Sequence, residues 1–328
     1  MLNDGAKVIR KLLQPYPTVS LSIKPTPFAV MKRVSARLRP GQRAWVMRDD
    51  LTGFALGGNK IRKLEYILGG ALARKVNTLV VTGATSFSRN AAAAGKALGI
   101  DVHVLIAGEA AGHNLLSREF FAVMGATMHY VADSEKLQSK QHEIVDALRT
   151  GGRNVQELHP GGSDTIGTLG YIEAFAEIIE RMEREGVVFD RVFHASGSAA
   201  TQAGLVLGQT FSGRDHMRIV GIATSKTAEV QTKRVADLAH ATAEMLDIDF
   251  DPSKVIVEDR YLGDGYPIPS AESRAAVEVF ATAEGLLFDP IYVGKAAAAL
   301  LGYARSGELG DTANVLLVHT GGNSGVYY

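Results

Sequence analysis

Residues 56 to 66 read Leu56-Gly57-Gly58-Asn59-Lys60-Ile61-Arg62-Lys63-Leu64-Glu65-Tyr66 and join a glycine turn to a helix. Apolar residues follow Lys60 at positions 61, 64, 68 and 72, which is helical spacing, so Lys60 belongs to the first helical turn. The helix dipole, a neighbouring cation and partial burial each disfavour the ammonium form of a lysine placed there. A neutral amine is a good nucleophile toward a carbonyl, so Lys60 is a candidate Schiff-base lysine. The alternative is an ordinary turn followed by a solvated lysine.

Strand and helix patterns alternate along most of the remaining chain. In the first part we expect helices at 7–13, between Pro25-Thr26-Pro27 and Leu38, and at 61–74, 91–98, 115–124 and 134–148, with strands at 44–47, 78–82, 101–107, 126–131 and 154–158. In the second part we expect helices at 171–185, 200–209, 227–246, 271–284 and 295–304, with strands at 191–195, 217–223, 255–257 and 314–319. Repeated units of a strand followed by a helix, with continuously apolar strands, predict parallel sheets covered on both faces.

Composition narrows the possible functions. The chain has 328 residues, of which 46% are hydrophobic, and its 35 basic and 35 acidic residues balance, so nothing attracts it to nucleic acid or an anionic membrane. It has no cysteine, which excludes disulfides, a thiol nucleophile and thiolate metal sites. No signal-like N-terminus and no membrane-length apolar run is recognisable. We therefore expect a cytoplasmic protein that acts on a small molecule, without a metal.

A second glycine-containing turn follows the strand expected at 191–195. It reads Ser196-Gly197-Ser198-Ala199-Ala200-Thr201 and enters a helix, so several backbone N–H groups converge at a helix N-terminus and can bind an anion. No Gly-Lys-Ser/Thr follows, so this is not a nucleotide P-loop. A tight strand-to-helix turn capped by Ser198 is the alternative.

The run from Met47 to Tyr66, Met-Arg-Asp-Asp-Leu-Thr-Gly-Phe-Ala-Leu-Gly-Gly-Asn-Lys-Ile-Arg-Lys-Leu-Glu-Tyr, resembles the pyridoxal phosphate (PLP) enzymes that include D-cysteine desulfhydrase and 1-aminocyclopropane-1-carboxylate deaminase. Further landmarks are similar to the family in the same order: Pro25-Thr26-Pro27, Gly161-Gly162-Ser163, Ser196-Gly197-Ser198, Asp289-Pro290-Ile291-Tyr292 and His319-Thr320-Gly321-Gly322. The resemblance implies a type II PLP-enzyme fold with two α/β domains, each with a mostly parallel open sheet covered by helices. The smaller domain is expected at 57–166, and the larger, PLP-binding domain at 1–56 plus 167–328.

The resemblance also implies roles for individual residues. Lys60 carries PLP, Asn59 bonds near the ring's phenolic oxygen, and the Thr320 hydroxyl meets the pyridine nitrogen. The phosphate is held by the turn of Gly197, Ser198, Ala199, Ala200 and Thr201, in which the two alanines stand where glycines are usual. Tyr266 and Tyr292 face the cofactor as catalytic and substrate-binding residues, where a phenol can hydrogen-bond the substrate or assist a proton transfer.

The loop after the strand at 78–82 departs most from the family pattern. The family has Gln-Ser-Asn-His/Gln, whereas this chain has Thr85-Ser86-Phe87-Ser88-Arg89-Asn90 and lacks two residues before the next helix. Aligned from the strand, Phe87 and Ser88 take the places of the family serine and asparagine; aligned back from Gly99, Thr85 and Ser86 take them. We expect residues 85–89 to bind substrate, with Ser86 or Ser88 as the catalytic hydroxyl. Arg89 either contacts a second anionic group of the substrate or points to solvent.

The activity implied is α,β-elimination on a small amino acid, as in D-cysteine desulfhydrase, which releases a keto acid, ammonia and the leaving group. Alternatives are a sulfo-lyase acting on cysteate or another anionic substrate, an aminocyclopropane carboxylate deaminase, and an inactive homologue that binds PLP or a nucleotide. By this resemblance, members of the family that open the cyclopropane ring carry Tyr-Glu-Gly-Lys where this chain has Tyr292-Val293-Gly294-Lys295. The missing glutamate argues against the cyclopropane substrate. A homodimer is expected.

Overall fold

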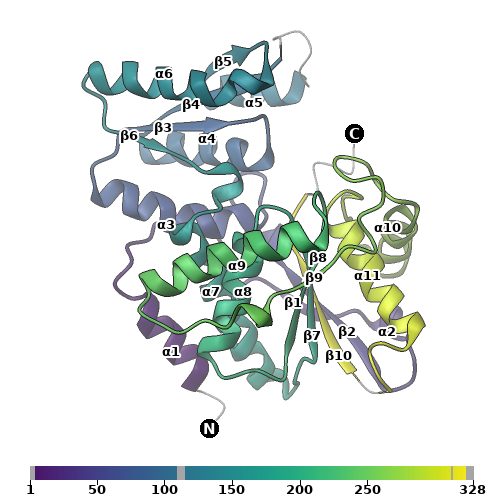
Figure 1. Ribbon diagram of the computed structural model, residues 1–328. Coiled ribbons are helices and arrows are strands. Elements are labelled where there is room, and N and C mark those ends of the chain that lie inside the picture. Colours follow the sequence, from purple (N-terminus) through teal and green to yellow (C-terminus); the bar gives the residue numbers. More distant parts are fainter. Residues whose placement is uncertain (1–3, 109–114, 312, 323–328) are drawn as a thin grey trace.

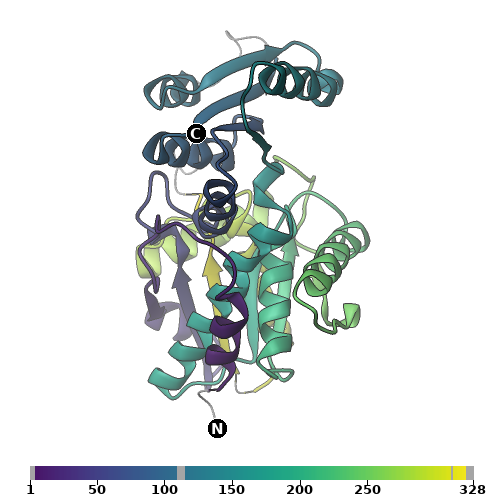
Figure 2. The ribbon, with the colours of Figure 1, turned by 90° about the vertical axis from the view of Figure 1, so that its left-hand side faces the viewer.

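The computed structural model describes residues 4–108, 115–311 and 313–322. Figure 1 shows two α/β layers, with the smaller sheet and its helices above the larger sheet, and helix α3 (Asn59–Ala73) between them. Figure 2, turned by 90°, shows the same separation of the two layers along the long direction of the molecule.

The larger sheet has six strands in the order β1-β2-β10-β7-β8-β9. Their bounds are β1 (Phe28–Val30), β2 (Gln42–Arg48), β10 (Ala313–His319), β7 (Arg191–Ser196), β8 (Arg218–Ala223) and β9 (Ile256–Glu258). Only the edge strand β1 is antiparallel to its neighbour. In the centre, His319 pairs with Arg48, so β10 and β2 end side by side and their carboxyl ends lie at the same sheet edge.

The smaller sheet is entirely parallel, with four strands in the order β5-β4-β3-β6. These strands are β5 (Thr127–Val131), β4 (Asp101–Ala107), β3 (Thr78–Thr82) and β6 (Val155–Glu157). One face packs on α3, α4 (Ser86–Leu98) and α5 (Leu115–Val123), and the other packs on α6 (Leu137–Thr150). The fold class expected from the sequence is therefore confirmed. The strands of this sheet lie within residues 78–157, and the domain limits at 57 and 166 stay a prediction.

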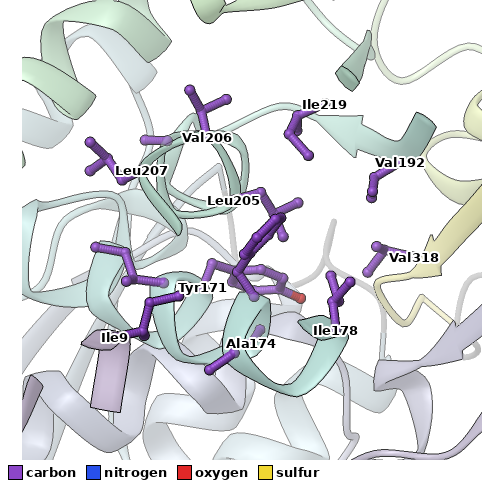
Figure 3. Packing of buried hydrophobic residues seen from close by; sticks show 14 of the residues in the cluster. Ile9, Tyr171, Ala174, Ile178, Val192, Leu205, Val206, Leu207, Ile219 and Val318 are labelled. Atoms are coloured by element: carbon purple, nitrogen blue, oxygen red, sulfur yellow. The ribbon is translucent and has the colours of Figure 1, made fainter. Parts of the chain in front are cut away.

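Helices cover both faces of the larger sheet. On one face lie α1 (Asp4–Leu13), α7 (Thr165–Glu185), α8 (Ala200–Phe211) and α9 (Ala228–Met245); on the other lie α2 (Lys32–Ser35), α10 (Ala271–Glu284) and α11 (Val293–Ser306). Figure 3 shows Tyr171, Ala174 and Ile178 of α7 packed beneath Leu205 of α8. Helices α7 and α8 can approach closely because Gly204 has no side chain. A Cβ there would lie only 2.5 Å from the Tyr171 Cβ.

Three expected elements are corrected by the structure. The helix expected after Pro25-Thr26-Pro27 is the strand β1 followed by the four-residue helix α2, because Phe28 to Val30 pair with Met47 to Trp45 and tertiary pairing overrides local preference. Helix α4 begins at 86 instead of 91, since Thr85 caps it. Helix α7 begins at 165 instead of 171, since the Asp164 side chain accepts the Gly167 N–H.

Candidate active site

A cavity of about 480 Å³ opens where four strands end, β3 of the smaller sheet and β7, β8 and β10 of the larger one. Much of its lining comes from residues at or just after the ends of these strands, namely 84–87 and 89, 195–199, 224–225 and 320–322. Ligands of parallel α/β folds bind at this edge of the sheet. The volume lies within the usual range for a small-molecule site.

The glycine turn before Lys60 is fastened to the end of β10. Gly57 and Gly58 have φ angles of 65° and 90°, which favour glycine. The Gly58 N–H donates to the Asp49 carbonyl at 3.0 Å, and the Asn59 N–H donates to the Thr320 carbonyl at 2.9 Å. A Cβ on Gly58 would lie 2.9 Å from that same Thr320 oxygen, so a larger residue does not fit. Backbone packing therefore sets the position of the first turn of α3, and with it Lys60.

Lys60 lines the cavity, and burial lowers the pKa of its amine to about 8. Desolvation disfavours the ammonium form, and a fraction of the amine is therefore neutral near neutral pH. This is the property expected of the lysine from its place after the glycine turn. It makes Lys60 the strongest nucleophile candidate in the cavity.

Most of the predicted site residues meet in this cavity. Its lining includes Asn59, Lys60, Thr85, Ser86, Phe87, Arg89, Gly197, Ser198, Ala199, Thr201, Tyr266, Tyr292 and Thr320. Ala200 and Ser88 are absent from the lining, and both are fully buried. The Ala200 N–H donates instead to the Ser163 hydroxyl at 3.1 Å. This hydrogen bond connects the turn at 196–201 to the segment 161–163.

The turn before α8, where the sequence predicts an anion cradle, lines the cavity at the N-terminus of that helix. A Cβ on Gly197 would lie 3.0 Å from the Thr224 hydroxyl oxygen, so the backbone passes close to β8. Ala199, just before α8, has φ 75° and ψ −48°, a strained conformation for a residue with a side chain. The Thr201 hydroxyl accepts a hydrogen bond from the side-chain amide of Asn59 at 3.0 Å, which connects this turn to the residue beside Lys60. Strain concentrated next to a cavity is typical of ligand-binding loops.

The 85–90 loop is the first turn of α4, and this corrects the expectation for Ser88. Thr85 and Ser88 form a capping box, in which the Ser88 hydroxyl also donates to the Gly83 carbonyl. Because its hydroxyl caps the helix from inside the protein, Ser88 is a structural residue at this point. Thr85 and Ser86 face the cavity at the helix N-terminus. This arrangement favours the register counted back from Gly99.

Two arginines lie in the cavity wall. Arg89 of α4 is half-buried, and its guanidinium donates to the Ser117 hydroxyl at 2.9 Å. Arg234 of α9, which sequence reasoning missed, also lines the cavity and donates to the Gly197 carbonyl at 3.3 Å. The expected alternative of a solvent-directed Arg89 does not match this placement. Together with Lys60, these side chains give the cavity a cationic character.

The two predicted tyrosines meet at the mouth of the cavity. Tyr266 is 54% exposed and Tyr292 38% exposed, and their ring centroids are 5.9 Å apart. Burial, together with a hydrogen bond to Tyr266, raises the pKa of Tyr292, so its phenol stays protonated and can donate a hydrogen bond. The Asp289 carboxylate fixes the start of α11 by accepting the Tyr292 N–H at 2.6 Å.

Lys63 is a further residue that the sequence analysis did not single out. It lies one helical turn after Lys60, is fully buried and donates to the Gly161 carbonyl at 3.3 Å. Burial and the nearby charge of Lys60 lower the pKa of Lys63 well below its ordinary value. Two lysines three residues apart at a glycine turn are a signal that could have identified it.

Comparison with known proteins matches residues 19–321 to the family described as "Pyridoxal-phosphate dependent enzyme". The chain belongs to the pyridoxal-phosphate dependent enzyme family. It is 36% identical over 327 residues to a "Putative 1-aminocyclopropane-1-carboxylate deaminase" of Pyrococcus furiosus, covering 98% of this chain and 96% of that protein. It is 32% identical over 321 residues to the "D-cysteine desulfhydrase" of Serratia proteamaculans, covering 96% of each. A solved "ACC deaminase homologue" superposes with a TM-score of 0.86 at 35% identity, covering 97% of this chain and 95% of that one.

Membership of the pyridoxal-phosphate dependent enzyme family confirms the expected fold type and cofactor. The residues present fit PLP: an amine with a pKa of about 8, a backbone cradle at a helix N-terminus and a hydroxyl at Thr320 face one cavity. Among the described residues, no cluster of three or more metal-ligating side chains occurs. No helix within the described ranges is long and apolar enough to cross a membrane.

Proposed function

We propose that this enzyme deaminates a small amino acid by α,β-elimination and releases a keto acid, ammonia and the β-substituent, as a D-cysteine desulfhydrase does. The observation that carries the proposal is Lys60, whose amine has a pKa lowered to about 8 by desolvation and which lines the same cavity as the protonated phenol of Tyr292. When bound there, PLP supplies the electron sink that makes the substrate Cα–H bond acidic. Relatives named for desulfhydrase and deaminase activities support this class of reaction.

Each residue has a proposed task. Lys60 would hold the cofactor, and its Nζ would accept the α-proton of the substrate. Tyr292 donates a hydrogen bond from its protonated phenol to the substrate or the leaving group, with Tyr266 beside it. Ser198, Ala199 and Thr201 hold the cofactor phosphate at the N-terminus of α8. The cavity thereby orients the Cα–H bond, which is then the bond that breaks.

The substrate carboxylate is proposed to bind at the N-terminus of α4. Thr85 and Ser86 line the cavity there and offer hydroxyls together with the backbone N–H groups of the first helical turn. A helix N-terminus favours an anion through both hydrogen bonds and the helix dipole. In this register Thr85 takes the place of the family serine, and Ser86 takes that of the family asparagine.

The proposed substrate is not aminocyclopropane carboxylate, although some relatives carry that name. The ring-opening activity goes with a glutamate after the second tyrosine, where this chain has Val293. The Val293 side chain is 1% exposed and packs in the core of the larger sheet. An apolar side chain in that position cannot transfer a proton or stabilise a charge.

A sulfo-lyase acting on cysteate is the second candidate, favoured by the arginines in the cavity wall. Arg89 and Arg234 both line the cavity, and a guanidinium binds sulfonate or carboxylate groups bidentately. A substrate whose β-substituent is anionic would use this charge, whereas cysteine would not.

One screen tests these candidates. The loaded enzyme is incubated with D- and L-cysteine, cysteate, β-chloroalanine, serine and aminocyclopropane carboxylate, and keto-acid release is measured. We expect release from a β-substituted substrate with loss of sulfide or sulfite. Efficient ketobutyrate production from the cyclopropane substrate would overturn the proposal, and no turnover on any substrate would favour an inactive PLP-binding homologue. Sedimentation of the loaded enzyme tests the expected homodimer.

A further inference from the structure

One face of α11 carries the loop that bears Tyr266. Tyr292, Lys295 and Gly302 lie three and seven residues apart, so they occupy one face of the helix. The loop runs down this face in the opposite direction: Tyr261 packs so closely on Gly302 that a Cβ there would overlap its hydroxyl. At the other end the Tyr266 ring contacts the Tyr292 ring. Lys295 lies between these two contacts.

The Lys295 side chain is fully buried and binds the backbone of this loop. Its Nζ donates to the Leu262 carbonyl at 2.8 Å and to the Gly265 carbonyl at 3.2 Å. Both hydrogen-bond partners are neutral carbonyl oxygens, and the charge of Asp289 raises the pKa of Lys295 by less than burial lowers it. Desolvating an ammonium group costs free energy that neutral acceptors only partly offset, so a buried lysine with this pairing is costly as a purely structural feature.

The position of Tyr266 depends on this backbone. Tyr266 directly follows Gly265, its side chain is 54% exposed, and its ring contact is with Tyr292. Gly263 and Gly265 have φ angles of 60° and 95°. Glycine reaches many backbone conformations, so the loop could take other shapes if its contacts were lost. A clamp on the Gly265 carbonyl therefore restricts the Tyr266 backbone in addition to the turn hydrogen bonds that Gly265 and Ile268 donate within the loop.

The start of the loop has its own anchors. The Arg260 guanidinium pairs with Glu258 and Glu308, and Tyr261 packs on Gly302 as described. Removing the Lys295 ammonium would therefore release residues 262–266 and leave residues 258–261 in place.

We propose that Lys295 is a positioning residue that clamps the Leu262 and Gly265 carbonyls and thereby holds Tyr266 against Tyr292 at the mouth of the cavity. Lys295 lies one helical turn after Tyr292 on the same face of α11. The first turn of this helix therefore carries one tyrosine of the pair and, through Lys295, holds the loop that carries the other. The effect on turnover rests on the proposed function, since it requires that Tyr266 contact the substrate. The effect on the loop does not.

Hydrogen exchange of the PLP-loaded enzyme tests the clamp without a substrate. In Lys295→Met, which keeps an unbranched apolar stem one atom shorter than lysine and removes the donors, we expect the amides of Gly265 and Ile268 to exchange at least about tenfold faster. These amides donate to Leu262 and Gly265 at 3.4 and 3.0 Å in the intact loop. Peptides from β7 and β8 and the visible absorbance of the cofactor should not change. Lys233→Met, at a lysine with a 76% exposed side chain, is the matched control.

Unchanged exchange in 262–268 would overturn the proposal, as would faster exchange spread over the whole larger sheet, which would make Lys295 a general structural residue. A double-mutant cycle with Tyr266→Ala then tests the link to turnover. We expect Lys295→Met to lower kcat/KM about tenfold in the wild-type background and less than twofold when Tyr266 is already absent. An equal loss in both backgrounds would refute an action through Tyr266. If no substrate is turned over, the proposed function fails, and the exchange data alone decide the role of Lys295.

Discussion

At the scale of single residues, Lys60 differs from the other lysines of the cavity region by what surrounds it. It combines a glycine turn, the first turn of a helix and a place in the cavity lining. Lys63 and Lys295 are also buried, but their amines bind backbone carbonyls. A low pKa alone therefore does not distinguish Lys60 from these lysines, and its access to the cavity is what supports the role proposed for it.

We expect Lys60→Ala to lose the visible absorbance of the bound cofactor while its circular dichroism stays that of the wild type. Without the amine, PLP is held only by non-covalent contacts. After borohydride reduction of the wild-type protein, peptide mass spectrometry should find PLP on Lys60. Finding it on Lys63 or Lys295 would contradict this assignment.

Cofactor loading should depend on pH through the same amine. The pKa of Lys60 is lowered to about 8, so the neutral fraction rises as pH increases through that value. We expect the rate at which apoenzyme and PLP develop visible absorbance to rise about tenfold between pH 7 and pH 8.5 and then to level off. A rate that keeps rising up to pH 10 would indicate an unperturbed lysine.

Arg89 offers a test of substrate charge. Arg89→Ala should raise KM for an anionic substrate such as cysteate by about ten- to a hundredfold, which corresponds to about 1.4 to 3 kcal/mol, and barely affect a neutral one. The reason is the loss of a guanidinium from the cavity wall. Equal losses on cysteine and cysteate would make Arg89 structural and favour the desulfhydrase assignment.

At the scale of elements, a buried ionic network joins three segments below the site. Arg62 of α3 is fully buried and pairs with Asp49 of the short helix η1 (Asp49–Leu51) and with Glu177 of α7, at 2.9 and 2.8 Å. The Tyr171 hydroxyl also donates to Asp49. Since the Asp49 carbonyl accepts the Gly58 N–H, the network supports the turn that delivers Lys60.

Breaking this network should cost far more than breaking a surface pair. Arg62→Met leaves two carboxylates buried without their partner, and we expect a loss of about 3 to 5 kcal/mol in the free energy of unfolding, measured by urea denaturation. The control is Arg10→Met, which breaks the half-exposed pair of Arg10 with Glu180 and should cost less than about 1 kcal/mol. Similar losses in both variants would contradict the role of burial.

At the scale of the whole molecule, the site forms where two sheets meet. Strand β3 of the smaller sheet brings Thr85 and Ser86, and strands β7 and β10 of the larger sheet bring the cradle and Thr320. Helix α3 begins between them, and Lys60 is on its first turn. Neither sheet alone carries both the proposed cofactor cradle and the proposed substrate loop.

The sequence by itself determined the α/β alternation, the helix after Gly57-Gly58 and the candidacy of Lys60, because these follow from apolar spacing and local turn chemistry. Family signatures in the sequence indicated the cofactor. Only the tertiary structure decided that Phe28 to Val30 form a strand, since an edge strand depends on its partner β2. Only the structure shows that the Ser88 hydroxyl caps helix α4, that Arg234 lines the cavity and that Lys295 binds the loop carrying Tyr266. These contacts join residues distant in sequence or depend on where a helix begins, which no local pattern records.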